Sequence, residues 1–577
     1  MSARRGVLAF VLAVVLLGFV VLVVAINLRW PSVGRPSEPV VLVFQLPETL
    51  EEGPPPPRAF PWAGRRRERL TLYDVLRGLR AAAADDRVAG LVLHIDSMDW
   101  GWAKVGEVRD AVLRFRAAGK PVYASLSGGG EREYLLASAA DRVGMPPASV
   151  LQVDGLVATA TYYRGAFDKF GVSPNFAYVG RFKSAVESYT RPDMSPDSRA
   201  ALSAVLDDLY EVLLTGIGAA RAMSRDSVAR LIDDGPFTAA EARQRGLLDT
   251  LIYDTEMDTL ALRRGRHRAP TQPFGRYVDG LVPSRLGPHV ALVTASGAIV
   301  SGRSRELPGM EDELGSETVI EALRQARTRK AIKAIVLRID SPGGTTQASD
   351  DIWREVERCR VVKPVIVSMS DVAASGGYYF AVAGDSIVAS PTTLTGAIGV
   401  YGGKFNILGL YRKVGLNVET VTRGRHAGML SPFRDFTPEE ERRFQESLES
   451  FYRGFVARVA RGRHLAVPAV DSVAEGRVWT GRAALERGLV DRLGGLETAF
   501  EMARARARIP RDAELVVERF PRVRRSFIQR MIEGLASGDD EMLAARSAPP
   551  VLRAWATVAR FPAGQPLSLM PWTLEVR

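Results

Sequence analysis

Cysteine and histidine are scarce in this sequence, which has one cysteine, Cys359, and five histidines among 577 residues. A single cysteine cannot form an internal disulfide, so a disulfide scaffold is excluded. No His-Glu-x-x-His motif or clustered metal-ligand spacing occurs, so we expect no zinc site and no cofactor.

The formal net charge is +11, but basic and acidic residues are interleaved without a zinc-finger or RNA-binding pattern. We therefore expect no nucleic-acid partner, and a basic surface that faces anionic lipid headgroups instead.

Lysine is the third scarce residue type, with nine lysines against 68 arginines. Arginine stays protonated in proteins and cannot act as a base, whereas a lysine can lose its proton when burial lowers its pKa. This chain uses arginine wherever positive charge alone is needed. A lysine at a conspicuous position is therefore a candidate for base chemistry.

Long apolar runs are missing except at the N-terminus, where residues 6–26 carry no charge. About 20 apolar residues are enough to span a bilayer as a helix. The run is longer than a signal-peptide core and lacks a good cleavage site, which favours an uncleaved anchor. Arg4 and Arg5 precede it and predict a cytoplasmic tail at residues 1–5. Residues 27–39 then form a proline-containing linker, and everything beyond lies outside the cytoplasm.

An internal repeat organises the remainder of the chain. Residues 93–97 read Leu-His-Ile-Asp-Ser, and residues 337–341, 244 positions later, read Leu-Arg-Ile-Asp-Ser. Further matches in the same order recur at offsets of 242–244, which indicates a duplicated unit. Short β-branched runs alternate with helical segments, which predicts an α/β fold with a mostly parallel sheet in each copy. The predicted segments are a first domain at 40–262, a linker at 263–287, a second domain at 288–510 and a C-terminal extension at 511–577.

Two residues break the symmetry of the repeat. Ser375 lies in Ala-Ala-Ser-Gly-Gly, and its counterpart 244 positions earlier is Glu131, or Arg132 if a gap falls differently. Lys183 has Ala427 as its counterpart 244 positions later. Each copy thus keeps one member of a Ser/Lys pair, as expected if each lost its redundant member after duplication.

The surroundings of Ser375 favour catalysis. Gly376 follows it directly, and Gly343 and Gly344 follow a neighbouring strand, so their amides are candidates for an oxyanion hole. A neutral Lys183 is the candidate base, with His426 as an alternative. Taken alone, Ser375 would be an ordinary turn residue, and Lys183 a surface charge or a partner of Glu187 one helical turn later. The reciprocal loss of partners favours the catalytic interpretation.

These residues resemble the long form of bacterial signal peptide peptidase A, a family of membrane-anchored serine proteases. The motifs that carry the resemblance are residues 182–187 (Phe-Lys-Ser-Ala-Val-Glu), 340–344 (Asp-Ser-Pro-Gly-Gly), 374–378 (Ala-Ser-Gly-Gly-Tyr) and 394–396 (Leu-Thr-Gly). The resemblance implies tandem ClpP/crotonase-like domains after one transmembrane helix, with Ser375 as nucleophile and Lys183 as general base. It also implies a homo-oligomer, a tetramer, in the bacterial inner membrane with its catalytic domains on the periplasmic side.

One position departs from the family pattern. Ala397 stands where the family often has a serine that hydrogen-bonds the lysine, so we expect Thr395 or a water molecule to orient Lys183. The predicted function is degradation of remnant signal peptides and other apolar peptides. A crotonase-type acyl-CoA enzyme and a non-catalytic oligomeric membrane scaffold are the alternatives. Whether the Ser/Lys pair forms within one chain, and what residues 511–577 do, is left open by the sequence.

Overall fold

The computed structural model describes residues 39–53, 70–262, 270–282, 286–305, 312–522 and 566–570, with the backbone of residues 575–576. The predicted anchor at residues 6–26 lies outside these described residues, as does most of the C-terminal extension. Among the described residues, no helix combines the length and apolar character needed to cross a membrane.

The first copy is built on a parallel sheet of strand order β10-β1-β2-β3-β4-β9. Both faces of this sheet are covered, and seven of the eight residues of β2 are buried, as is usual for parallel strands. The strands are β1 (Val40–Gln45), β2 (Val88–Ile95), β3 (Val122–Leu126), β4 (Arg142–Met145), β9 (Thr250–Leu251) and β10 (Thr271–Pro273). The helices are α2 (Leu72–Ala84), α3 (Trp102–Ala117), α4 (Glu131–Ala137), α7 (Pro196–Arg221), α8 (Arg225–Asp234), α9 (Ala239–Gln244), α10 (Asp254–Leu262) and α11 (Phe274–Asp279).

The second copy repeats this plan on a sheet of order β20-β18-β16-β14-β11-β22, with β17 and β21 continuing from β16. All its pairings are parallel except that of β18 with β20. The strands are β11 (His289–Ser296), β14 (Ile332–Ser341), β16 (Val365–Ala374), β17 (Ser386–Ala389), β18 (Leu394–Gly396), β20 (Val478–Thr480), β21 (Arg492–Leu493) and β22 (Val516–Phe520). The helices are α12 (Ser316–Thr328), α13 (Thr346–Val362), α14 (Gly376–Ala381), α16 (Pro438–Arg463), α17 (Val467–Val473), α18 (Gly481–Glu486) and α19 (Leu496–Arg506).

The ends of the longest helices show how closely the copies correspond. Both α7 and α16 have 26 residues and a proline at the first position. Ser195 caps the first helix and Thr437 caps the second, each accepting a hydrogen bond from a backbone amide three residues on. Both helices end at a residue in the left-handed region, Ala222 and His464, respectively. The duplication inferred from the sequence therefore extends to helix length and capping.

Two predicted boundaries need correction. Strand β10 pairs with β1 although its residues fall in the segment predicted as a linker, and β22 pairs with β11 although it lies beyond residue 510. Neither strand has a strong apolar pattern, because each is a short edge strand that buries few side chains. The sheets, not the loops around them, therefore set where each copy ends.

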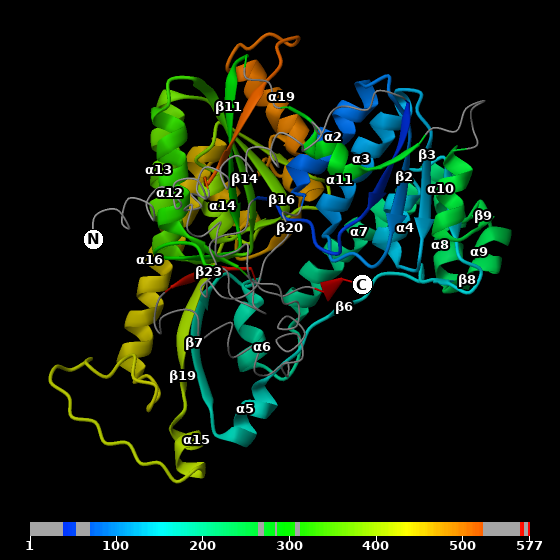
Figure 1. The fold of residues 1–577 in the computed structure, drawn as a ribbon. Coiled ribbons are helices and arrows are strands. Elements are labelled where there is room, and N and C mark those ends of the chain that lie inside the picture. Colours follow the sequence, from blue (N-terminus) through cyan, green and yellow to red (C-terminus); the bar gives the residue numbers. More distant parts are fainter. Residues whose placement is uncertain are drawn as a thin grey trace, which may run out of the picture.

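A third sheet joins the two copies, in the order β13-β12-β15-β23-β19-β7. Strand β7 of the first copy runs antiparallel to β19 of the second, in register from Ser173 against Asn406 to Val179 against Val400. Figure 1 shows these two strands descending side by side from the body, with α5 and α15 at their lower end. The strands are β7 (Ser173–Val179), β12 (Ala298–Val300), β13 (Glu313–Gly315), β15 (Gly343–Thr345), β19 (Val400–Asn406) and β23 (Leu567–Leu569), and the nearby helices are α5 (Arg164–Phe170), a 3₁₀ turn (Ser184–Val186), α6 (Glu187–Thr190) and α15 (Leu408–Lys413).

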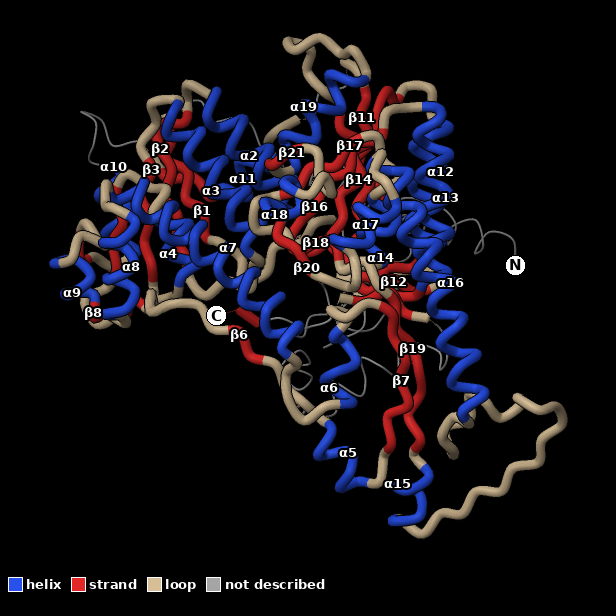
Figure 2. Tube along the Cα trace, turned by 180° about the vertical axis from the view of Figure 1, so that it is seen from behind, coloured by secondary structure: helices blue, strands red, loops and turns tan. Residues whose placement is uncertain are grey.

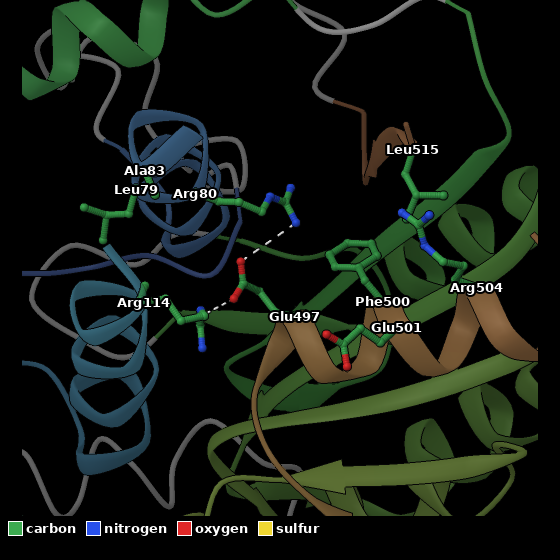
Figure 3. A pocket seen from close by; sticks show the side chains of 10 residues that line it. Leu79, Arg80, Ala83, Arg114, Glu497, Phe500, Glu501, Arg504 and Leu515 are labelled. Atoms are coloured by element: carbon green, nitrogen blue, oxygen red, sulfur yellow. Dashed lines mark hydrogen bonds and ion pairs between the residues drawn. The ribbon is translucent and has the colours of Figure 1, made fainter. Parts of the chain in front are cut away.

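Two small sheets complete the fold: β5 (Val150–Leu151) with β8 (Phe237–Thr238), and β6 (Ala158–Thr159) with β24 (Glu575–Val576). Helix α19 lies at the boundary between the copies, because it packs on β14 and β16 and its Glu497 reaches α2 and α3. Figure 3 shows the pocket along this boundary, where Glu497 of α19 pairs with Arg80 of α2 and Arg114 of α3. These ion pairs are partly exposed and contribute little to stability.

Candidate active site

Ser375 lies at a strained turn between the end of β16 and the start of α14. Its φ is +53° and its ψ is −111°, an uncommon conformation for a residue with a side chain. The turn is held by two backbone hydrogen bonds of 2.8 Å, from the Ser375 amide to the Gly396 carbonyl and from the Tyr379 amide to the Ser375 carbonyl. Strain of this kind needs support from its surroundings and is concentrated at functional sites.

Lys183 reaches this turn from the first copy because two glycines permit close backbone contact. A Cβ on Gly180, whose φ is +105°, would lie 2.4 Å from the carbonyl carbon of Glu475. A Cβ on Gly476 would lie 2.6 Å from the Lys183 amide nitrogen. The Phe182 amide donates to the Glu475 carbonyl at 2.8 Å. The segment after β7 is therefore fixed against the second copy.

The two candidate catalytic side chains meet within one chain. Lys183 Nζ lies 2.7 Å from Ser375 Oγ, and both side chains are completely buried. Burial lowers the pKa of Lys183 well below its usual value, because a charged amine is disfavoured away from water. A neutral amine at hydrogen-bond distance from a hydroxyl can accept its proton, which is what a serine nucleophile requires.

A backbone carbonyl orients the lysine. Lys183 Nζ also donates to the Ala397 carbonyl at 3.1 Å, and Ala397 has a φ of +50°. The Thr395 hydroxyl, one of the two expected orienting groups, donates instead to the Ala373 carbonyl at 2.8 Å. Ala397 therefore holds the lysine through its main chain, which explains how this position can lack a hydroxyl side chain.

The three glycines predicted for the oxyanion hole have different environments. The Gly343 amide donates to Ser341 Oγ at 3.2 Å and is therefore already engaged. The Gly344 and Gly376 amides converge, since a Cβ on Gly376 would lie 3.1 Å from the Gly344 amide nitrogen. Gly344 and Gly376 are thus the candidate oxyanion donors. Gly343, with φ of +106°, allows the backbone to pass close to a bound chain.

Part of the C-terminal extension lies across these glycines. Strand β23 pairs antiparallel with β15, placing Ser568 opposite Gly344. The Met570 amide donates to the Pro342 carbonyl at 2.6 Å, and the Thr346 amide donates to the Pro566 carbonyl at 3.2 Å. In an antiparallel ladder every second opposite pair of residues is hydrogen-bonded. Gly344 and Ser568 lie midway between the two bonded pairs just named and therefore form the next hydrogen-bonded pair.

The Ser568 carbonyl is therefore beside the candidate oxyanion donors. A Cβ on Gly343 would lie 1.9 Å from the Ser568 carbonyl oxygen and 2.8 Å from the Gly376 amide nitrogen. The Ser568 oxygen and the Gly376 amide are therefore close to the same position beside Gly343. On its other edge β23 pairs with β19, where Leu567 is opposite Tyr401. The site thus accommodates an extended strand between β15 and β19. No sequence pattern signals this strand, because the C-terminal extension has no regular apolar period around residues 567–569.

In the first copy a carboxylate, that of Glu131, occupies the position that corresponds to Ser375. Glu131 Oε1 accepts hydrogen bonds from the Asp154 amide at 3.0 Å and the Gly155 amide at 2.9 Å. Burial raises the pKa of Glu131. Ala427, the counterpart of Lys183, is exposed in the long loop before α16. Neither counterpart therefore completes a second Ser/Lys pair.

A second lysine from the first copy supports the loops of the site. Lys104, on α3, lies 2.8 Å from Asp340 Oδ2 and 3.3 Å from Asp371 Oδ2. Burial opposes its charge, but the carboxylates of Asp340 and Asp371 outweigh this and hold the pKa of Lys104 well above its usual value. Asp371 Oδ1 also accepts the amides of Ala103 and Lys104, at 2.9 and 3.1 Å. Asp340 directly precedes the Ser341 loop, and Asp371 is four residues before Ser375.

A buried arginine extends this network between the copies. Arg338 is completely buried and lies 2.9 Å from Glu52 and 2.6 Å from Glu107, both of the first copy. Its counterpart in the first copy is His94, whose Nε2 lies 2.9 Å from Asp258 Oδ1. Sequence reasoning missed the network because Lys104 and Glu52 belong to no motif. The scarcity of lysine is the one signal that could have pointed to Lys104.

His426, the alternative base, does not face Ser375. Its ring nitrogens lie 3.5 Å from Glu439 and 3.8 Å from Glu440, at the start of α16. Lys183 is the ionisable side chain that hydrogen-bonds Ser375 in the described part of the chain. Three or more His, Cys, Asp or Glu side chains placed to hold a metal ion are not found among the described residues.

Comparison with known proteins gives consistent matches. The model of peptidase family S49 matches residues 114–263 and 357–509. The chain is 37% identical over 459 residues to "Serine protease SPPA, chloroplastic" of Arabidopsis thaliana, covering 78% of this chain and 67% of that protein. It is 33% identical over 462 residues to "Protease 4" of Salmonella typhi, covering 77% and 73%. Against "Protease 4" of Haemophilus influenzae the identity is 29% over 567 residues, covering 92% and 91%.

Proposed function

Because this chain belongs to peptidase family S49, as a serine peptidase of the long signal peptide peptidase A type, we propose that Ser375 and Lys183 form its catalytic dyad. The observation that carries the proposal is the 2.7 Å contact between Lys183 Nζ and Ser375 Oγ inside a buried site. Membership of a peptidase family favours this function over an acyl-CoA enzyme or a non-catalytic scaffold.

The proposed reaction starts with transfer of the Ser375 hydroxyl proton to neutral Lys183. Ser375 Oγ attacks the peptide carbonyl, and the Gly344 and Gly376 amides stabilise the negative charge on its oxygen. Collapse breaks the C–N bond, and the leaving amine takes the proton from Lys183. Water then enters, gives a proton to Lys183 and attacks the acyl carbon, and Ser375 leaves with that proton.

We propose that the substrates are extended apolar peptides, such as signal peptides released into the membrane. The path of β23 between β15 and β19 supports an extended conformation, because main-chain hydrogen bonds on both edges recognise backbone without regard to sequence. The apolar run at residues 6–26 supports an anchor in the bacterial inner membrane with the catalytic domains on the periplasmic side. The family resemblance supports a homo-oligomer.

The dyad is tested by labelling with a fluorophosphonate probe, which reacts with activated serines. The full-length protein should be labelled at Ser375, whereas Lys183→Met and Lys183→Arg should not be, because methionine and protonated arginine cannot accept the serine proton. Lys330→Met serves as the matched control, since Lys330 is an exposed lysine. Peptide hydrolysis retained by both Ser375→Ala and Lys183→Ala proteins would overturn the assignment.

The substrate class is tested with the full-length protein in lipid vesicles. We expect a membrane-inserted apolar peptide to be cleaved much faster than a soluble polar peptide of the same length. Equal rates would contradict the proposed substrate while leaving the dyad intact.

A further inference from the structure

Arg477, between α17 and β20, is a cation that lies over two aromatic rings. Its guanidinium carbon is 4.9 Å from the centre of the Phe182 ring and 4.3 Å from that of the Trp479 ring. Phe182 belongs to the first copy and directly precedes Lys183, whereas Trp479 lies on β20 of the second copy. Strand β20 pairs with β18 and contacts α7 of the first copy, at the centre of the molecule in Figure 2. Arg477 therefore bridges the two copies beside the lysine of the proposed dyad.

The guanidinium of Arg477 is held by these rings and not by a carboxylate. No described residue forms an ion pair with Arg477, and its buried Nε has no hydrogen-bond partner. Burial lowers the pKa of Arg477, and the nearby charges of Arg487 and Arg181 lower it further. A cation over the face of an aromatic ring is attracted by the negative charge of that face. A planar guanidinium also stacks on rings, which an ammonium group cannot do.

The backbone around Arg477 holds the loop that orients the lysine. The Arg477 carbonyl accepts a hydrogen bond from the Ala397 amide at 2.7 Å. The Gly476 amide donates to the Ile398 carbonyl, also at 2.7 Å. The Ala397 carbonyl in turn accepts the hydrogen bond from Lys183 Nζ. A shift of Arg477 would therefore move the acceptor of the lysine as well as its neighbour in sequence.

The first copy has part of this cluster, the contact between a ring and an outer arginine. Phe237 corresponds to Trp479 at an offset of 242, and each ring is followed by a threonine that caps the next helix. The guanidinium carbon of Arg245 lies 5.1 Å from the centre of the Phe237 ring. At the same offset, that of Arg487 lies 3.9 Å from the centre of the Trp479 ring. This outer contact belongs to the fold of both copies.

The contact between Arg477 and Phe182 is absent from the first copy. The counterpart of Arg477, 242 positions earlier, is Gly235, and a proline follows it. The counterpart of Phe182, 244 positions later, is His426, which is not an aromatic partner of any arginine there but lies 3.5 Å from Glu439. A contact that the fold itself required would recur in both copies. This contact instead accompanies the meeting of lysine and serine.

We propose that Arg477 is a positioning residue for the reaction, because it holds the segment of Lys183 against the second copy. Its contact with Phe182 fixes the residue before the lysine, and its carbonyl fixes Ala397, which orients the lysine amine. A segment that is held in place also keeps water from Lys183, whose side chain is completely buried. The inference rests on the dyad of the proposed function and adds the residue that keeps its two halves together.

Three variants of the full-length protein test this role by peptide hydrolysis and by the rate of fluorophosphonate labelling. Arg477→Met keeps the length of the side chain without its charge, and it should lower kcat and labelling at pH 7 on the order of tenfold, with KM within about twofold. Arg477→Lys keeps the charge but not the planar group, so its rates should lie between these two. Arg487→Met is the matched control, because it removes a cation from the same ring, and its rates should stay within about twofold of the unmodified protein.

The pH dependence of labelling separates positioning from a general loss of structure. The charged groups packed on the Lys183 segment include Arg477, Arg181 and Glu475, of which the last two pair at 2.6 Å. When the segment loosens, water reaches Lys183, and its pKa rises toward the ordinary value of about 10.4. Labelling of Arg477→Met protein should therefore recover as the pH is raised, because the lysine becomes neutral again. Circular dichroism at each pH checks that the protein is folded.

A double variant shows whether Arg477 acts through Phe182. Phe182→Leu should lower kcat by a similar factor, and the protein with both Phe182→Leu and Arg477→Met should lose little more than either single variant, because both break the same contact. An unchanged rate in Arg477→Met protein, a loss that is equal at every pH in the folded protein, an equal loss in Arg487→Met protein, or additive losses in the double variant would contradict the inference. Labelling of the unmodified protein at Ser375 reports on the dyad separately from these outcomes.

Discussion

The two copies place different residues at the same turn before the same helix. In the second copy Ser375 takes a strained conformation before α14, and Lys183 lies against it at 2.7 Å. In the first copy Glu131 begins α4 and its carboxylate accepts two backbone amides. The turn of the second copy thus presents a hydroxyl to a lysine amine, whereas the turn of the first copy presents a carboxylate that accepts hydrogen bonds from the backbone.

The first copy nevertheless supplies the second with two lysines whose pKa values are shifted in opposite directions. Burial lowers the pKa of Lys183. Lys104 is largely buried, with 13% of its side chain exposed, but Asp340 and Asp371 hold its pKa high. The contrast shows that burial alone does not decide the charge of a lysine, since neighbouring carboxylates decide it here. A neutral lysine suits proton transfer, and a charged one suits fixing two loops.

The largest effect is expected from changes at the divided dyad. Ser375→Ala and Lys183→Met should each lower kcat/KM by on the order of 10⁴-fold or more, because the nucleophile and its base act as a unit. Glu131→Gln, at the corresponding turn of the first copy, should leave kcat/KM within about threefold, since the amides that donate to the Glu131 carboxylate, those of Asp154 and Gly155, belong to its own copy. Peptide hydrolysis measured on the same preparations tests the asymmetry. A large loss in Glu131→Gln protein would show that the first copy takes part in catalysis.

A smaller loss is expected when the charged lysine is removed. Lys104→Met leaves Asp340 and Asp371 without their cation, so the loops carrying Gly344 and Ser375 should shift. A displacement of about 1 Å at a reacting group costs about 10²-fold in rate. The loss should fall on kcat rather than KM, and Lys104→Arg should recover part of it because it retains the charge. Lys363→Met is the control, since Lys363 caps backbone carbonyls near α12, away from the site.

If Lys104→Met protein unfolds, labelling is measured at a temperature where circular dichroism shows it folded. Normal acylation by the fluorophosphonate probe in that folded protein would mean that Lys104 only joins the copies. Loss of acylation with KM unchanged would identify it as a positioning residue.

Sequence reasoning reached the repeat, the α/β class and the two side chains that meet in the proposed dyad, because each left a local signal. Strand endings repeated at a fixed offset, and Ser375 and Lys183 each lacked a counterpart. The contact between them is non-local, and the sequence could not say that it forms within one chain. Strand β23 and the engaged Gly343 amide were missed for a different reason. A short strand that pairs through its backbone needs no side-chain pattern.

The C-terminal extension offers a way to sharpen the comparison, because it runs beside corresponding strands of both copies. It pairs with β19 through β23 and with β6 through β24, but only β23 lies beside the candidate oxyanion donors. A segment tethered in the same chain competes at a roughly millimolar effective concentration. Deleting residues 566–577 should therefore raise the rate of probe labelling, by about tenfold if the strand binds as peptides do. Deleting residues 571–577 keeps β23 and should have less effect. Equal labelling of all three proteins would mean that the strand does not occupy the site in solution.

The smallest effect is a change in stability that separates the two buried lysines. A lysine whose folded pKa is lowered binds its proton more weakly in the folded than in the unfolded chain. Stability therefore rises with pH between the lowered pKa and the unfolded value of about 10.4. Lys183→Met should remove this penalty, so its melting temperature should exceed that of the unmodified protein at pH 7. The gain should shrink as the pH approaches about 10.4, where the unfolded lysine is also neutral. Each kcal/mol corresponds to about 2–4 °C in domains of this size, which is measurable by calorimetry.

Lys104→Met should instead lower the melting temperature at pH 7, because the carboxylates of Asp340 and Asp371 lose their partner. A melting temperature of Lys183→Met protein that stays below that of the unmodified protein across this range would mean that Lys183 is charged in the folded state, and the base would have to be sought elsewhere.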